Sequence, residues 1–159
     1  SQFDFYSGGG LDIAFLGFGE IDAAGNVNVS KLGGNTVGPG GFIDIAQNAR
    51  KVVFCGTFDT GGTRLQTGDG TLRVTSHGRI RKLVEKVDQI TFSGPQASVQ
   101  GQHVIYVTER AVFELREDGV HLVEIAPGID LQADVLDRMG FTPRMESPLS
   151  EMNSGLFKE

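Results

Sequence analysis

Three apolar runs along the chain predict buried strands. They cover residues 11–17, 51–56 and 104–108, and none shows the regular polar alternation of a half-exposed strand. Continuous apolar runs of this length are typical of strands covered on both faces, as in parallel sheets. Between the first two runs, one helical face can gather Phe42, Ile43, Ile45, Ala46 and Ala49. This spacing predicts a helix over residues 42–49.

Shorter β-type segments flank turn residues and predict hairpins. Residues 63–67 and 71–76 lie either side of Gly68-Asp69-Gly70, and residues 111–115 and 120–125 lie either side of Glu117-Asp118-Gly119. Glycine and aspartate at such positions favour tight connections between antiparallel strands. A smaller hairpin is expected where residues 27–29 follow a turn at residues 23–26.

Towards its C-terminus, the chain is predicted to contain one helix and then a tail. Asp130 and Gly140 are suitable caps for a helix over residues 131–139, while Ser93-Gly94-Pro95 is expected to stop a strand. Residues 144–159 are polar without periodicity and are predicted to form a C-terminal tail. The remaining residues, 1–143, are expected to form one domain, because no linker or repeat divides them.

The order of elements predicts the fold class. A strand, a glycine-rich loop, a helix and a second strand follow one another, which is typical of the α/β class. We therefore expect an open, mostly parallel sheet with flanking helices and β-hairpins.

Composition and charge exclude several classes of function. The chain has 159 residues and a formal net charge of −6, whereas nucleic-acid binding favours a basic face. No apolar run approaches the roughly 20 residues that a membrane span needs, and no secretory signal pattern is visible. A single cysteine, Cys55, excludes an internal disulfide and fits a reducing compartment. We expect a cytoplasmic protein.

A glycine-rich loop at residues 33–42 is the first candidate site. Gly40 and Gly41 carry no Cβ, so their backbone can turn through positive φ and lie close to another molecule. A loop that leads into a helix also directs free N–H groups outward, and these suit an anion or a developing oxyanion. The alternative is a tight turn packed under a sheet.

Other chemical motifs are weaker. The three histidines, at positions 77, 103 and 121, lack zinc-site spacing, so no metal is expected. A nucleophile elbow, a Walker-type loop and a dinucleotide fingerprint are absent from the sequence. Carboxylates that follow strands are candidates, because open α/β proteins bind ligands at the carboxyl ends of strands. They are Glu20, Asp22 and Glu109, with turn caps or surface charges as the alternative, and Glu109 could pair with Arg110.

Several ordered motifs in register resemble the family I CoA-transferases, and the closest resemblance is to the short-chain acyl-CoA:acetate or propionate type. The similarity extends to about residue 143, and its motifs occupy residues 9–17, 25–30, 38–44, 53–58, 106–113 and 124–131. The resemblance implies a fold of two related open α/β halves with the active site between them. This chain resembles the later part of the second, or beta, half.

The resemblance also implies a mechanism. In the family, a glutamate upstream of the segment matched here attacks the acyl-CoA and becomes a glutamyl-CoA thioester. The glutamate motif is not found in this chain, so the chain alone is expected to be inactive. Its expected partners are the alpha half and the upstream beta half, together with a small carboxylic acid. Coenzyme A or acyl-CoA is then a substrate, with no permanently bound cofactor.

The family resemblance assigns candidate site residues. The glycine loop at Gly38, Gly40 and Gly41 matches the loop whose backbone N–H groups hold the oxyanion of the tetrahedral intermediate. Residues 59–64 resemble a segment near CoA, which makes Gly61, Gly62 and Arg64 candidate CoA-binding residues. For Arg64 a plain surface position is the alternative.

Two other functions remain open. One is a non-catalytic acyl-CoA-binding or assembly module that keeps the loop without the chemistry. The other is a sugar-phosphate isomerase-like enzyme of the same architecture, which rests on fold analogy alone. An oligomer is expected, because the aromatic N-terminal residues Phe3, Phe5 and Tyr6 would otherwise be exposed.

Overall fold

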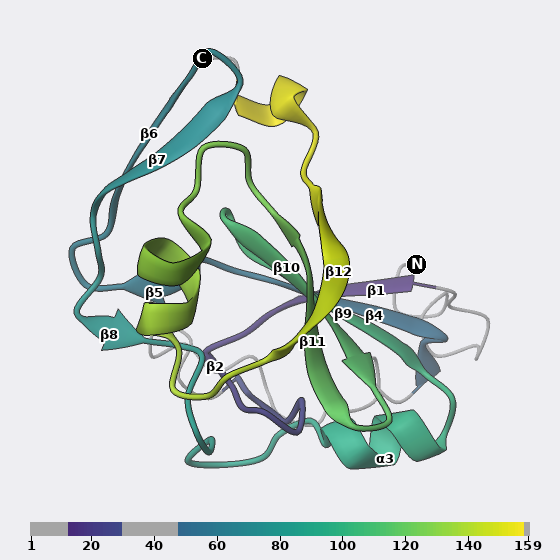
Figure 1. Ribbon diagram of the computed structural model, residues 1–159. Helices are drawn as coiled ribbons and strands as arrows, with labels where there is room; N and C mark the ends of the chain where they lie inside the picture. Colours follow the sequence, from purple (N-terminus) through teal and green to yellow (C-terminus); the bar gives the residue numbers. More distant parts are fainter. Residues whose placement is uncertain (1–12, 30–47, 158–159) are drawn as a thin grey trace, which may run out of the picture.

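A six-stranded sheet organises the computed structural model, which describes residues 13–29 and 48–157 (Figure 1). The strands lie in the order β1-β4-β9-β10-β11-β12. Their bounds are β1 (Ile13–Gly17), β4 (Lys51–Cys55), β9 (His103–Val107), β10 (Ala111–Arg116), β11 (Gly119–Ile125) and β12 (Arg144–Glu151). The predicted strands at residues 11–17, 51–56 and 104–108 are therefore confirmed as β1, β4 and β9.

The sheet is mixed but mostly parallel. Strand β4 pairs in parallel with β1 and with β9, and β11 pairs in parallel with β12, whereas β10 is antiparallel to both of its neighbours. Three of the five pairings are thus parallel. This confirms the expected α/β class with an open, mostly parallel sheet.

Three two-stranded ribbons surround the sheet. They are β2 (Glu20–Ile21) with β3 (Val27–Asn28), β5 (Asp59–Thr60) with β8 (Ile80–Arg81), and β6 (Arg64–Gly68) with β7 (Thr71–Ser76). All three predicted hairpins are confirmed as β2–β3, β6–β7 and β10–β11. The β6–β7 ribbon extends away from the sheet, and its tip lies beside the C-terminal helical turn (Figure 1).

The hydrophobic core lies on one face of the parallel strands. Phe54 of β4 and Tyr106 of β9 are fully buried and stack with ring centroids 5.7 Å apart. The Tyr106 hydroxyl donates to the Gly25 carbonyl at 2.8 Å, so this buried polar atom has a partner. Apolar side chains from the connections cover this face, including Phe18, Ile21, Val27, Phe92 and Ala97.

The expectation that β1 is buried on both faces is wrong. Ala14 points into the core and is 3% exposed, but Ile13 is 41% exposed and Phe15 is 70% exposed. Apolar residues occupy both faces of this strand, so the sequence pattern could not show that only one face is covered. The covering connections pack on the core face.

One helix of the structure, α3, was not predicted from the sequence. Ser93-Gly94-Pro95 ends the preceding extended segment, as expected, and it also starts α3 (Gly94–Val99), where the Ser93 side chain caps the helix by accepting from the Gln96 N–H. Proline is compatible with the first helical turn, because it has no N–H to pair. The predicted helix 42–49 lies outside the described residues apart from Asn48 and Ala49.

The helix expected over residues 131–139 is shorter and irregular. It consists of a π turn, η1 (Leu131–Val135), followed by a 3-10 turn, η2 (Leu136–Arg138). The predicted Asp130 cap is confirmed, since its carboxylate accepts from the Ala133 N–H at 2.9 Å. Gly140 is not a left-handed cap; a Cβ there would lie 2.7 Å from the Glu85 nitrogen. It allows close packing instead.

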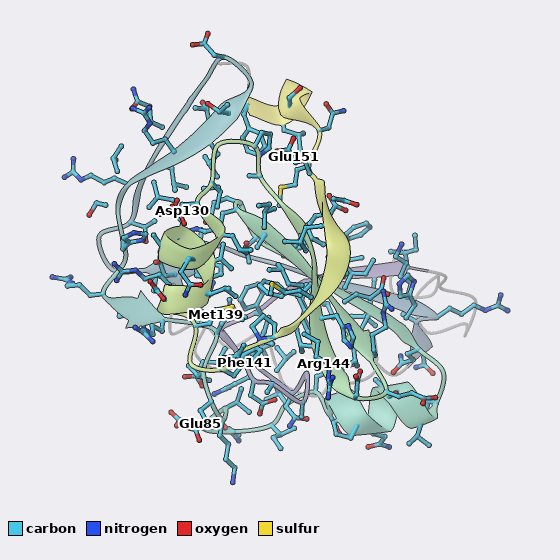
Figure 2. The ribbon with its side chains drawn as sticks, in the orientation of Figure 1. Glu85, Asp130, Met139, Phe141, Arg144 and Glu151 are labelled. Atoms are coloured by element: carbon cyan, nitrogen blue, oxygen red, sulfur yellow. The ribbon has the colours of Figure 1, made fainter. Side chains whose placement is uncertain are left out.

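The expected irregular tail is also wrong. Arg144 and Glu151 mark the two ends of β12, which crosses beside β11 (Figure 2). A 3-10 turn, η3 (Ser154–Phe157), follows, and the side chains of Met152 and Phe157 are 8% and 7% exposed. A lone strand whose partner lies some twenty residues earlier leaves little local signal. Within the described residues, no helix has the length and apolar character needed to cross a membrane.

Replacing Phe157 tests whether this C-terminal segment belongs to the core. Phe157→Ala should lower the free energy of unfolding by about 3 kcal/mol, because it removes a buried ring and leaves a cavity. Leu156→Ala is the matched control, since Leu156 is 70% exposed and should cost less than about 0.5 kcal/mol. Urea denaturation measures both. Equal effects would show that the segment does not pack as described.

Candidate functional site

Polar residues gather at the carboxyl ends of two neighbouring parallel strands. Thr57 and Asp59 follow β4, while Thr108, Glu109 and Arg110 follow β9. Because β4 and β9 are parallel and paired residue by residue, these two loops emerge at the same edge of the sheet. This edge is where open α/β proteins place their ligands.

Arg110 is the centre of the cluster. Its side chain is fully buried, and its Nε donates to Glu109 Oε2 at 2.5 Å. Its Nη2 lies 3.4 Å from Asp59 Oδ1, and its Nη1 donates to the Asp134 carbonyl at 3.0 Å. The guanidinium also stands 4.6 Å above the Phe58 ring. The Glu109–Arg110 ion pair suggested by the sequence is therefore confirmed.

Glu109 is tied into the scaffold through both oxygens. While Oε2 accepts from Arg110, Oε1 accepts from the Phe58 backbone N–H at 2.7 Å. The carboxylate thus joins the loop after β9 to the loop after β4. A carboxylate held in this way fixes the relative position of two loops, and an attack on a substrate would require one of these hydrogen bonds to break.

Asp59 is almost completely buried at 2% exposure. Its Oδ1 accepts from Arg110 Nη2 and from the Thr63 hydroxyl. Its Oδ2 has no hydrogen-bond partner within the described part of the chain. Asp59 therefore anchors the start of the 59–64 segment to Arg110.

Lys82 brings a second cation to the same edge. The residue is 9% exposed, its Nζ donates to Thr57 Oγ1 at 3.4 Å, and it stands 4.3 Å from the centre of the Phe18 ring. Burial lowers the pKa of the Lys82 ammonium, and the charges of Glu109 and Asp59 act in the opposite direction. A Cβ at Gly56 would lie 2.8 Å from Phe18, so glycine makes room for this packing.

Sequence reasoning missed Lys82 and the anchoring role of Asp59. Lys82 lies in a short extended segment, and its side chain reaches the site only because the Ile21 N–H donates to its carbonyl and fixes that segment beside β2. The residue spacing therefore carries no signal for it.

The other two carboxylate candidates serve a hairpin. Asp22 Oδ1 accepts from the backbone N–H groups of Ala24 and Asn26, at 3.1 and 3.0 Å. Glu20 Oε1 accepts from the Asn28 side chain at 3.1 Å. These contacts hold the β2–β3 turn, so the turn-cap interpretation is confirmed for Asp22.

The candidate CoA-binding residues lie on the segment that Asp59 anchors. Gly61 and Gly62 have φ of 83° and 108°, a conformation that favours glycine, and a Cβ on Gly62 would meet nothing within 4 Å. The Gly61 carbonyl accepts from the Arg79 N–H at 3.1 Å. Arg64 is exposed at the start of β6. The structure thus brings these three residues next to the buried cluster, and their role in binding CoA stays a prediction.

The candidate oxyanion loop at Gly38, Gly40 and Gly41 lies outside the described residues. Among the residues that the structure describes, no group of three or more His, Cys, Asp or Glu side chains could hold a metal ion. The histidines pair instead with single carboxylates, as His121 does with Asp118 at 2.6 Å and His103 with Glu114 at 3.1 Å.

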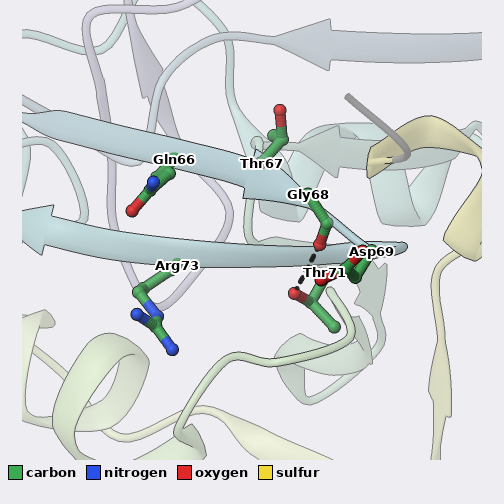
Figure 3. A pocket seen from close by; sticks show the side chains of 6 residues that line it. All are labelled: Gln66, Thr67, Gly68, Asp69, Thr71 and Arg73. Carbon is green, nitrogen blue, oxygen red and sulfur yellow. Dashed lines mark hydrogen bonds between the residues drawn. The ribbon is translucent and has the colours of Figure 1, made fainter.

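Two hollows on the described surface lie away from this edge. One, of about 190 Å³, lies on the β6–β7 ribbon and is lined by Gln66, Thr67, Gly68, Asp69, Thr71 and Arg73 (Figure 3). The Thr71 hydroxyl donates to the Gly68 carbonyl at 2.9 Å across the turn. The other, of about 480 Å³, lies between α3 and the β10–β11 turn. Neither contains Arg110 or Lys82.

The chain is similar to CoA-transferases over almost its whole length. It is 51% identical over 157 residues to acetate CoA-transferase YdiF of Escherichia coli O157:H7, which is 99% of this chain and 30% of that protein. It is also 51% identical to caffeate CoA-transferase of Acetobacterium woodii, covering 100% of this chain and 31% of that protein. The chain thus spans about 30% of the length of the curated relatives that it matches. No protein-family model matches it.

Solved structures show the same relationship. The crystal structure of the acyl-CoA transferase YdiF, a thioester complex with CoA, superposes with a TM-score of 0.90 at 51% identity and covers 98% of this chain and 30% of that one. The decarboxylase AibA/AibB superposes with a TM-score of 0.63 at 24% identity, covering 94% of this chain and 54% of that one. The second likeness shows the fold alone.

Removing the buried guanidinium tests the cluster. Arg110→Met should lower the free energy of unfolding by about 3 kcal/mol or more, because the buried Asp59 and the partly buried Glu109 would be left without their cation. Arg116→Met is the control, since Arg116 is 43% exposed where it pairs with Glu114, and should cost less than about 1 kcal/mol. Urea denaturation at neutral pH measures both. Equal losses would contradict the cluster.

Lys82 should make stability depend on pH. Because burial lowers the pKa of Lys82 from its ordinary value of 10.5, the unfolded chain holds this proton more tightly than the folded protein does. Stability relative to Lys82→Met should therefore rise as pH increases through the folded pKa towards 10.5. Thermal unfolding at pH 7 and pH 10 measures the difference, with the exposed Lys86→Met as control. A falling difference would contradict the burial of the ammonium.

Proposed function

The chain is a homologue of a portion of the CoA-transferases, and from this we propose that it forms part of an enzyme that moves CoA between a short-chain acyl-CoA and a carboxylic acid. The observation that carries the proposal is 51% identity over 99% of the chain to one acetate CoA-transferase. A TM-score of 0.90 to a related thioester complex with CoA supports it.

The proposed reaction uses a glutamate outside this chain. Its carboxylate oxygen attacks the thioester carbonyl, and the CoA thiolate leaves as a mixed anhydride forms. The thiolate then attacks the glutamyl carbonyl, so that a glutamyl-CoA thioester forms and the first carboxylic acid is released. The acceptor acid reverses these steps. Covalent catalysis of this kind replaces one difficult transfer with two easier ones.

Within this chain, we assign oxyanion stabilisation to Gly38, Gly40 and Gly41. Each attack places negative charge on a carbonyl oxygen, and backbone N–H groups can stabilise it only where no side chain blocks the approach. In other enzymes, loss of one such donor costs about 2.7–4 kcal/mol of transition-state stabilisation.

The Arg110 cluster has a positioning role in this proposal. Asp59, Glu109 and Arg110 fix the loops that follow β4 and β9 relative to one another. Catalysis by a preorganised site requires that such loops do not move when charge develops. The Lys82 ammonium adds a positive charge at the same edge, where it favours the approach of carboxylates.

Gly61, Gly62 and Arg64 are assigned to CoA in the same proposal. Gly62 leaves the backbone of this turn open to a ligand, while Gly61 packs beside Ile80, and Arg64 presents an exposed guanidinium that suits a phosphate group. The thioester complex with CoA of the related YdiF supports a CoA-binding role for the homologous fold.

We extend the proposal to the setting of the enzyme. The remaining portion would consist of the alpha half and the upstream beta half, and the complete enzyme would be a cytoplasmic oligomer. A non-catalytic acyl-CoA-binding or assembly module is the second candidate. A decarboxylase shares the fold at 24% identity, so the fold alone does not fix the chemistry, and the non-catalytic module therefore stays an alternative. A sugar-phosphate isomerase-like activity rests on that same fold analogy and has no further support.

Trapping the covalent intermediate tests the function. The complete enzyme, incubated with acetyl-CoA without an acceptor acid, should acquire one covalently bound CoA. Peptide mass spectrometry should find the adduct on a glutamate outside these 159 residues, because Glu109 is bound through both oxygens and Glu20 belongs to a hairpin. An adduct on Glu109 or Glu20 would contradict the mechanism. Binding of acetyl-CoA without any adduct or transfer would favour the non-catalytic module.

A glycine variant tests the oxyanion role in the same assay. Gly41→Val should slow adduct formation by about 100-fold or more, because a branched side chain keeps the backbone away from the thioester carbonyl. Gly68→Ala is the control: a Cβ there meets nothing within 4 Å and the residue has no positive φ, so the rate should be unchanged.

A further inference from the structure

A two-glycine turn joins the buried cluster to the β6–β7 ribbon. Asp59 precedes Gly61 and Gly62, and Thr63 follows them. The Thr63 hydroxyl donates to Asp59 Oδ1, so a side-chain hydrogen bond bridges the two glycines. A Cβ on Gly62 would meet nothing within 4 Å, which leaves the backbone of the turn accessible between its two fixed ends. We call residues 59–64 the CoA turn, after the ligand proposed for it.

The CoA turn is also held by the segment that leads into β8. Strand β5, at the start of the turn, pairs with β8, and the Gly61 carbonyl accepts from the Arg79 N–H at 3.1 Å. Gly78 lies in close contact with the same turn, because a Cβ there would stand 2.5 Å from Thr63 Oγ1. A side chain at position 78 would therefore displace the Thr63 hydroxyl. The backbone on both sides of the turn is shaped around this one hydrogen bond.

The buried carboxylate of Asp59 makes the Thr63 hydrogen bond important. Asp59 is 2% exposed, and its Oδ1 accepts from Thr63 and from Arg110 Nη2. Its Oδ2 has no hydrogen-bond partner within the described residues. Water cannot readily replace a lost bond to a buried carboxylate, so each remaining bond counts. Without the hydroxyl, Asp59 would keep only Arg110, and the end of the turn would lose its link to the cluster.

Arg64 depends on the same link for its position. It directly follows Thr63 and is exposed at the start of β6. On its other side, the Thr75 hydroxyl donates to the Arg64 carbonyl at 3.2 Å. The pairing of β6 with β7 shifts register between Arg64 and Leu65, so the regular ladder does not by itself fix this residue. The bond between Thr63 and Asp59 therefore sets where the Arg64 side chain leaves the sheet.

We propose that Thr63 is a positioning residue for CoA, because its hydrogen bond to Asp59 holds the Gly62 backbone and the Arg64 guanidinium in place for one CoA molecule. This inference rests on the proposed function. The Thr63 hydroxyl faces the buried carboxylate and acts through the turn. A turn that is ordered before the ligand arrives loses less entropy on binding, so Thr63 contributes to CoA affinity and takes no part in the transfer step.

Affinity for desulfo-CoA tests the role of the Thr63 hydroxyl. This analogue keeps the phosphates and lacks the thiol, so calorimetry on the complete enzyme measures binding without chemistry. Thr63→Val removes the hydroxyl and should weaken binding about tenfold, while Thr63→Ser keeps the hydroxyl and should bind like the unsubstituted enzyme. Thr71→Val is the matched control, because the Thr71 hydroxyl donates to the Gly68 carbonyl at the far tip of the ribbon. It should bind normally. Unchanged affinity of Thr63→Val would overturn the proposal.

Coupling to Arg64 separates positioning from a general loss of structure. If Thr63 acts by placing Arg64, the two substitutions are not independent. Thr63→Val should then weaken desulfo-CoA binding less than about threefold in enzyme that already carries Arg64→Met. Another tenfold loss in that background would overturn the positioning role. Thr63→Ala also lacks the hydroxyl and should repeat both results, so the test does not depend on how well the valine variant folds.

The positioning role and the proposed function fail in different ways. If Thr63→Val weakens desulfo-CoA binding but acetyl-CoA leaves no adduct on a glutamate, the positioning role stands and the proposed transfer is wrong. If the adduct forms while Thr63→Val binds desulfo-CoA normally, the transfer stands and the positioning role is wrong. Failure of the unsubstituted enzyme to bind desulfo-CoA would overturn both.

Discussion

The burial of one guanidinium is the constraint on which the functional edge of the sheet depends. Arg110 has no exposed surface, and a buried cation is stable only if anions and acceptors surround it. Asp59 and Glu109 supply the charges, and the Asp134 carbonyl supplies a further acceptor. These groups come from the loops after β4 and β9 and from η1. One side chain therefore ties together three segments that are far apart in the sequence.

The two faces of the parallel strands have different roles. The inner face holds the core, where Phe54 and Tyr106 stack and the connections pack. The outer face is apolar at Phe15 and polar at Glu114. A single sheet thus provides the chain's own stability on one side, while its other side carries exposed apolar and polar side chains.

The proposed reaction is divided between this chain and the remaining portion of the enzyme. The described residues form a rigid edge with buried charges, and the proposed nucleophile belongs to the remaining portion of the enzyme. Glu109 illustrates the difference between position and role. It follows a parallel strand, where ligands are commonly bound, yet both of its oxygens are engaged in holding the scaffold. Glu109 therefore contributes by holding the loops after β4 and β9 in position.

The sequence by itself determined the features that arise from neighbouring residues. Apolar runs predicted β4 and β9, turn residues predicted the β6–β7 and β10–β11 hairpins, and the adjacency of Glu109 and Arg110 predicted their ion pair. Only the tertiary structure decided which face of β1 is covered, that residues 144–151 pair with β11, and that Asp59 and Lys82 join the cluster. Each of these outcomes depends on contacts between segments distant in sequence, and local periodicity carries no information about such contacts.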